Sequence, residues 1–65
     1  MNIELIEQKR LEKNLTVTAL CELAGIDRST YYKAMEEPQN IRYSTVSKLV
    51  KALRLNAAEK AQIFN

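Results

Sequence analysis

Apolar residues recur along the chain with the period of an α-helix, and no segment shows the strict alternation of a β-strand. This pattern predicts four amphipathic helices and a fifth near the end of the chain. The predicted segments are residues 2–13, 17–24, 28–36, about 44–53, and a last helix that begins at the sequence "NAAE". Because 65 residues allow only one small domain, the helices must all share one core. The sequence therefore predicts an all-α domain.

The apolar side of each predicted helix supplies the candidate core residues. They are Ile3, Ile6 and Leu11; Val17, Leu20, Cys21, Leu23 and Ala24; Thr30, Tyr31, Ala34 and Met35; Val46, Leu49, Val50, Ala52 and Leu53; and Ala57, Ala61 and Phe64, with Ile63 beside them. Arg10 falls within the first apolar stripe. It either snorkels to water at the rim, which is the favoured interpretation, or pairs with a carboxylate in the core. Ile63 and Phe64 either complete the core or form a small dimer patch.

Capping residues mark the predicted helix ends. Asn14 suits the left-handed position that ends a helix, and Thr16 is a good N-cap for the second helix. Gly25 ends that helix, and Asp27 is predicted to accept hydrogen bonds from the free N–H groups of the third. The "NAAE" of residues 56–59 is close to a capping box.

The composition narrows the possible chemistry. The chain has no histidine and one cysteine, Cys21, which excludes a disulfide framework, a zinc site built from protein ligands alone and a histidine general base. No constellation of nucleophile, base and acid is visible, so an enzyme is the least favoured class. Cys21 is interpreted as a small buried residue rather than a redox switch. We expect no metal and no cofactor.

Charge and hydropathy give a broad expectation for location and partners. A net charge of +2 permits binding to nucleic acid but does not demand it. No apolar run approaches the roughly 18 residues of a membrane span, and Met1 to Glu4 do not resemble a secretory signal. We therefore expect a soluble, intracellular protein without a membrane partner or a small-molecule ligand.

The short joint formed by residues 24–27 predicts that the second and third helices meet at an angle, as in a helix-turn-helix. On a helical wheel the third helix separates its two tyrosines. Tyr31 belongs to the core side, where its hydroxyl needs a partner or an outlet to solvent. Tyr32 lies on the polar side. That side comprises Arg28, Ser29, Tyr32, Lys33 and Glu36.

These residues resemble the Cro and phage-repressor group of helix-turn-helix regulators (XRE type), and the resemblance covers nearly the whole chain. The matching pattern consists of Arg10, Leu15-Thr16, Leu20-Cys21, Gly25-Ile26, and Tyr31 with Ala34. The resemblance implies a compact five-helix, lambda-repressor-like domain over residues 1–65, with the helix-turn-helix motif at about residues 16–36. It also implies binding to double-stranded DNA.

The chain departs from the family pattern at two positions. Val17 stands where family members often have a glutamine that meets the DNA backbone. Met35 stands where they often have a glutamate that pairs with the arginine matching Arg10. Two alternatives for Arg10 follow: Glu36 receives it from the edge of the core, or it snorkels to water beside Met35.

The resemblance and the exposed face together predict a sequence-specific transcriptional regulator, a repressor, that reads the major groove as a homodimer on a pseudo-palindromic operator. The predicted base-reading residues are Arg28, Ser29, Tyr32 and Lys33. The predicted contacts to the DNA backbone are Thr16, Thr18, Asn40, Arg42, Tyr43 and Ser44, and the dimer candidates are Ile63 and Phe64. Glu36 and Glu37 oppose nonspecific binding. Such a protein is bacterial or phage-encoded, cytoplasmic and associated with the nucleoid.

Two alternatives stay open at this point. One is a protein-interaction module, an antitoxin or adaptor, that keeps the helix-turn-helix shell and holds a partner with Tyr32, Glu36, Glu37 and the following loop. The other is the N-terminal DNA-binding domain of a longer regulator, because the ending "AEKAQIFN" carries no helix stop signal.

Overall fold

The computed structural model describes residues 1–64, and it confirms the all-α fold. The elements are α1 (Glu4–Glu12), α2 (Val17–Ala24), α3 (Arg28–Glu36), the 3-10 turn η1 (Pro38–Asn40), α4 (Tyr43–Leu53) and α5 (Ala57–Phe64). The described residues contain no strand. The helix bounds agree with those expected from the sequence to within two residues, and the predicted continuation of the last helix to Asn65 lies outside the described residues.

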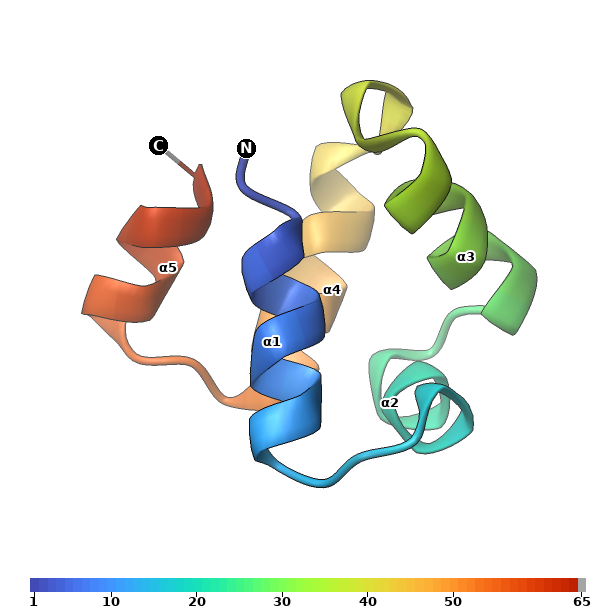
Figure 1. Ribbon diagram of the computed structural model, residues 1–65, viewed down its shortest axis with the longest axis horizontal. Helices are drawn as coiled ribbons and strands as arrows, with labels where there is room; N and C mark the ends of the chain where they lie inside the picture. The colour runs from blue at the N-terminus through green and yellow to red at the C-terminus, as the bar shows by residue number, and fades with distance from the viewer. Residues whose placement is uncertain (65) are drawn as a thin grey trace.

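The helices enclose one core with α4 at its centre. α4 packs against both α2 and α1, and α5 packs against α1 (Figure 1). α5 and α3 lie on opposite sides of α1 in this view, and the start of the chain lies next to the end of α5. The backbone N–H of Asn2 donates to the carbonyl of Ile63 at 2.7 Å, which ties these two ends of the described chain together.

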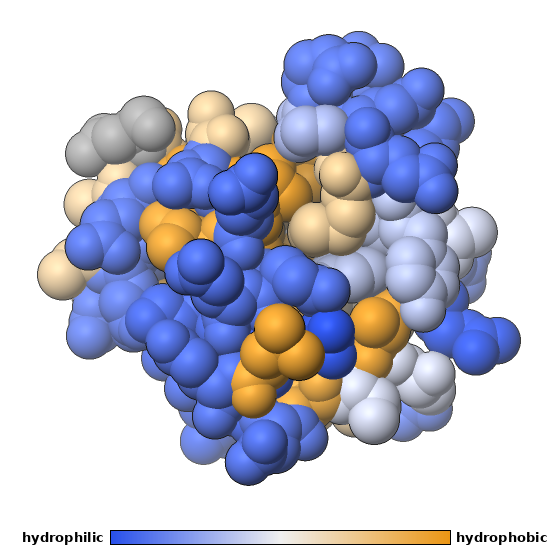
Figure 2. Space-filling model, viewed as in Figure 1, coloured by the Kyte–Doolittle hydropathy of each residue, from blue (hydrophilic) through white to orange (hydrophobic). Residues whose placement is uncertain are grey.

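The core is almost entirely aliphatic, with Tyr31 as its one buried aromatic ring among residues 1–64. The buried residues are Ile3, Ile6, Leu20, Cys21, Tyr31, Ala34, Val46, Leu49, Val50, Leu53, Leu55 and Ile63. No charged side chain of residues 1–64 is buried. On the face shown in Figure 2, polar residues cover most of the surface and apolar residues show as separate spots. Burial of the large aliphatic side chains contributes about 1.5–3 kcal/mol each.

Two leucines predicted in the core are instead on the surface. Leu11 and Leu23 are 59% and 63% exposed. Leu11 lies about 140° around α1 from Ile6, and Leu23 lies about 110° around α2 from the midpoint of the buried pair Leu20 and Cys21, so both leucines project away from the buried face. A helix of eight or nine residues buries only a narrow stripe, and the predicted stripes were too wide.

The buried face of α5 also differs from the prediction. Ala57 and Ala61 are exposed, Phe64 is half-buried, and Ile63 is fully buried. The larger apolar area of isoleucine outweighs that of two alanines in setting the rotation of the helix. Lys9 of α1 supports the same rotation, because its Nζ lies 2.9 Å from Oε2 of Glu59, one turn before Ile63.

Most predicted caps are confirmed. Thr16 Oγ1 accepts from the N–H of Ala19 at 3.0 Å, and Asn14 has a φ of 56°. The side chains of residues 56 and 59 accept reciprocally from each other's N–H at 2.8 and 3.0 Å. The prediction for Asp27 was wrong: it occupies the N-cap position, but its side chain makes no capping hydrogen bond and only its carbonyl accepts, from the N–H of Tyr31.

The helices described here are short, the longest having 11 residues. None of those in residues 1–64 has the length and apolar character needed to cross a bilayer.

Candidate nucleic-acid interface

The joint between α2 and α3 is built around Gly25. Its φ of 72° lies in the left-handed region, which glycine adopts without steric cost. The N–H groups of Gly25 and Ile26 donate to the carbonyls of Glu22 and Cys21 at 3.3 and 3.0 Å, which closes the end of α2. Figure 1 shows α2 nearly end-on and α3 obliquely across the view. The two helices therefore meet at a large angle, as the short joint predicts.

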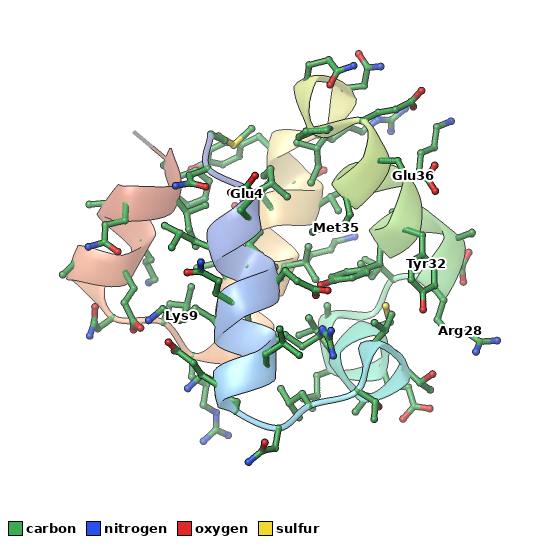
Figure 3. All side chains as sticks on the ribbon, viewed as in Figure 1. Glu4, Lys9, Arg28, Tyr32, Met35 and Glu36 are labelled. Atoms are coloured by element: carbon green, nitrogen blue, oxygen red, sulfur yellow. The ribbon has the colours of Figure 1, made fainter. Side chains whose placement is uncertain are left out.

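α3 has one anchored side and one exposed side. Tyr31 and Ala34 are its buried residues. The exposed residues of the helix are Arg28, Ser29, Thr30, Tyr32, Lys33 and Glu36. In Figure 3, Arg28 and Tyr32 extend into the open, whereas Met35 points toward α1. All four side chains expected to read bases are thus free to meet a ligand.

An open hollow separates α3 from the start of α4. Its lining residues are Thr30, Lys33, Ala34, Glu37, Asn40, Ile41, Arg42 and Thr45. The hollow brings Lys33, a predicted base-reading residue, together with Asn40 and Arg42, two predicted backbone contacts. Glu37 adds a carboxylate to the same surface. Thr30 was expected on the core side of α3; it is exposed because the hollow leaves this flank of the helix uncovered.

The start of α2 presents a second group of predicted backbone contacts. Thr16 and Thr18 are exposed, and Val17 between them is half-buried against the core. The oxygen of Thr16 is occupied as an acceptor for Ala19, but its O–H can still donate. The free N–H groups of the first turn and the positive end of the helix dipole favour an anion here.

The first turn of α4 carries the last two predicted backbone contacts. Ser44 is exposed, and Tyr43 is 66% exposed. The ring of Tyr43 packs against that of Phe64, with the ring centroids 5.1 Å apart. Neither Tyr43 nor Ser44 lines the hollow, and the Tyr43 ring lies toward α5 instead.

The two dimer candidates have different environments. Ile63 is 0% exposed, so it completes the core, and a partner chain could not touch it without opening the fold. Its assignment as a dimer residue is therefore corrected. Phe64 is half-buried beside Tyr43 and keeps part of its ring on the surface.

Arg10 makes a bidentate ion pair with a carboxylate, which was the less favoured of the two sequence alternatives. Its Nε and Nη2 donate to Oε1 and Oε2 of Glu7 at 2.7 and 3.0 Å, and its Nη1 donates to the carbonyl of Leu15 at 2.7 Å. The hydroxyl of Tyr31 donates to the same Glu7 carboxylate. The Arg10 side chain is 13% exposed. The partner is Glu7 rather than Glu36 because a residue three positions earlier in the helix lies on the same face, a spacing that sequence reasoning could have used.

The ionisation of this cluster follows from its hydrogen bonds. Donation by Arg10, and to a lesser extent by Tyr31, holds the pKa of Glu7 below its ordinary value, against the opposite effect of burial. Burial raises the pKa of the Tyr31 phenol far above its ordinary range, and the neighbouring Glu7 carboxylate acts in the same direction. The cluster therefore holds a charged ion pair and a neutral phenol at neutral pH.

The residues described offer little other chemistry. No three or more histidine, cysteine, aspartate or glutamate side chains of residues 1–64 gather where they could hold a metal ion. Cys21 is 2% exposed, and burial raises the pKa of its thiol, which disfavours the reactive thiolate. Its expected place in the core is confirmed.

Comparison with known families agrees with this geometry. The family model for helix-turn-helix proteins of the Cro/C1 type matches residues 6–60, and the chain belongs to this family. No curated protein and no solved structure matches the chain. The family is a DNA-binding and typically non-enzymatic one, so this protein is a DNA-binding helix-turn-helix protein.

Proposed function

We propose that the protein is a sequence-specific transcriptional repressor that reads the major groove of an operator with the exposed side of α3. Residues 1–65 act as one domain, with the motif at about residues 16–36. The protein binds as a homodimer to a pseudo-palindromic site whose half-sites lie about one helical turn apart. It represses by occupying its site, needs no cofactor, and works in the cytoplasm at a bacterial or phage genome.

The observation that carries this proposal is the two-sided character of α3. Tyr31 and Ala34 anchor the helix, and the opposite side offers four polar or aromatic side chains to a ligand. Arg28 and Lys33 can donate to guanine O6 and N7. Ser29 can donate or accept, and Tyr32 can place its ring on a thymine methyl group or its hydroxyl on a phosphate.

The predicted backbone contacts lie on both flanks of this reading side. Thr16 and Thr18 stand at the start of α2, and Asn40 and Arg42 stand across the hollow from Lys33. Two strands of phosphates border the major groove, so contacts on both flanks fix the register of α3 within it. Ser44 and Tyr43 follow Arg42 in the chain but do not line the hollow, so we assign them a smaller part in these contacts.

The test begins with selection of bound duplexes from a random pool. The best site and a shuffled duplex are then titrated at two salt concentrations. We expect one enriched, pseudo-palindromic site and tighter binding to it than to the shuffled duplex. No enriched site, with equally weak and salt-sensitive binding to both duplexes, contradicts the proposal and favours a protein-interaction module that uses Tyr32, Glu36 and Glu37.

Substitutions then distinguish residues that contact bases from residues that contact the DNA backbone. Arg28→Ala or Lys33→Ala should cost about 1–3 kcal/mol on the selected site and relax base preference at particular positions. Arg42→Ala should weaken binding to every duplex and reduce the salt slope by about 1. Lys51→Ala is the matched control, because Lys51 is an exposed cation at the other end of α4 from Arg42. It should change neither quantity.

The oligomeric state is tested by analytical ultracentrifugation with and without the selected site. We expect two chains per operator. Phe64→Ala tests the remaining dimer candidate: it should weaken binding to a full site more than to an isolated half-site. Equal weakening on both sites contradicts a dimer role for Phe64.

A further inference from the structure

We propose that Glu7 and Tyr31 are positioning residues that fix the orientation of α3, and with it the side chain of Tyr32, for base recognition. This inference rests on the proposed function, since it assigns specificity to a contact between α1 and the reading helix. Neither residue belongs to the set predicted to contact DNA. Tyr31 is 1% exposed, and Glu7 belongs to α1.

α3 packs on the rest of the molecule through Tyr31, Ala34 and the partly buried Met35. Tyr31 and Ala34 are its only buried residues, and an alanine side chain can lock neither the rotation nor the tilt of a helix. The hydroxyl of Tyr31 makes the one side-chain hydrogen bond between α3 and another element of residues 1–64. Met35 shares a second hollow with Glu7, but a thioether is a weak acceptor. Apolar contacts are non-directional, so the Tyr31 bond is the directional constraint on α3.

The acceptor of that bond is itself fixed on two sides. Both oxygens of Glu7 receive Arg10, and the remaining Arg10 nitrogen donates to Leu15, the residue before the N-cap of α2. One carboxylate and one guanidinium thus connect α1, the segment that leads into α2, and α3. Through this cluster, α3 and the segment that leads into α2 are hydrogen-bonded to the same part of α1.

The orientation of Tyr31 passes directly to the reading side. The rings of Tyr31 and Tyr32 are in edge-to-face contact, with centroids 6.0 Å apart and planes at 81°. Tyr32 is 52% exposed. Edge-to-face contacts have a preferred geometry, so a shift of the buried ring changes the rest position of the exposed one. A base contact made by Tyr32 therefore depends on the bond between Tyr31 and Glu7.

The primary test compares Tyr31→Phe with the wild type on the selected operator and on a shuffled duplex. The variant keeps the ring and its contact with Tyr32 and loses only the hydroxyl. We expect the ratio of the two dissociation constants to fall about five- to tenfold, comparable with losing one weak base contact, while binding to the shuffled duplex stays unchanged. Each dissociation constant is corrected for the fraction of folded protein, which is measured by circular dichroism.

Ile63→Val is the matched control for stability. Ile63 is fully buried on α5, away from α3, so its truncation destabilises the core without touching the cluster. We expect this variant to keep the wild-type specificity ratio. A Tyr31→Phe protein that is folded and keeps the ratio within twofold of wild type overturns the inference, as does an equal loss of specificity in Ile63→Val.

Glu7→Gln supplies a second variant should Tyr31→Phe fail to fold. Glutamine keeps an acceptor for Tyr31 but loses the charge that holds Arg10, so we expect a smaller loss of the ratio. The double variant should lose less than the sum of the two separate losses, because both changes act within one connected cluster. The inference is contradicted if the two losses of the specificity ratio simply add in the double variant. It is also contradicted if a folded Glu7→Gln protein keeps the wild-type specificity ratio.

A readout without DNA separates this inference from the proposed function. Amide chemical shifts of residues 28–36 should change in Tyr31→Phe and stay in place in Ile63→Val. A wild type that prefers no duplex refutes the proposed function, whatever these shifts show. A wild type that prefers its site, with unmoved α3 shifts in Tyr31→Phe, refutes the positioning role alone.

Discussion

Replacing Arg10 by methionine tests whether the cluster on α1 stabilises the fold. The substitution removes two hydrogen bonds to Glu7 and one to the carbonyl of Leu15, at 2.7–3.0 Å. Methionine retains an unbranched apolar stem, so packing along α1 is largely kept. Glu7 keeps the hydroxyl of Tyr31 as a donor but loses its counter-charge.

The expected loss of unfolding free energy depends on how exposed the Arg10 and Glu7 side chains are. Hydrogen bonds to charged groups contribute about 1.5–3 kcal/mol each when they are shielded from water. The Arg10 side chain is 13% exposed, but that of Glu7 is 40% exposed, so water partly replaces the lost donors. We therefore expect Arg10→Met to lower the free energy of unfolding by about 2 kcal/mol in total, below the sum of three such bonds. For a domain of this size that corresponds to a fall in Tm of about 10 °C.

The assay is thermal and urea unfolding followed by circular dichroism at neutral pH. Lys13→Met is the control: it makes the same change in charge at an exposed residue whose side chain has no hydrogen bond or ion pair within residues 1–64. It should change the free energy by less than about 0.5 kcal/mol. An Arg10→Met protein as stable as the wild type refutes a structural ion pair and returns Arg10 to the role of a snorkelling rim residue.

Three further changes test the core, the turn and the ion pair. Leu20→Ala should cost about 2–5 kcal/mol in urea unfolding, whereas Leu23→Ala, at a 63% exposed residue, should cost under about 0.5 kcal/mol; equal losses contradict the observed face of α2. Gly25→Ala should cost about 1–2 kcal/mol from its φ of 72° alone, since an added Cβ meets nothing within 4 Å; an unchanged Tm argues against backbone strain. The fold lowers the pKa of Glu7 from 4.5, so the stability contributed by the Glu7 carboxylate is fully present above pH 4.5 and is lost as the pH falls through the pKa of the folded protein. Glu7→Gln should therefore flatten the acid side of a curve of Tm against pH. An acid side identical to that of the wild type argues against the Glu7–Arg10 pair.

Helix positions and helix ends could be predicted from the sequence because their causes are local. The left-handed residues Asn14 and Gly25, the cap at Thr16 and the reciprocal cap at residues 56 and 59 all act over three or four positions. Arg54, which ends α4 with a φ of 54°, escaped prediction because arginine carries no preference for that conformation.

The exposed side of α3 was also predictable, because it follows from the helical period and from the anchoring of Tyr31. The hollow could not be predicted, because it depends on how α3, η1 and the start of α4 approach one another. Lys33 faces Asn40 and Arg42 only because η1 turns the chain back toward α3. The hydrophobic period of the sequence carries no information about that approach between separate segments.

Five helices, most of their ends, the angled joint and most of the exposed side of α3 could be read from the sequence, because hydrophobic period and capping are properties of neighbouring residues. Packing was needed to show how narrow the buried stripes of α1 and α2 are and how α5 is rotated, as Leu11, Leu23 and Ile63 show. It also decided that Tyr31 meets Glu7, 24 residues earlier in the chain. Such choices depend on the area and hydrogen bonds that distant segments offer one another, and these quantities exist only once the helices pack.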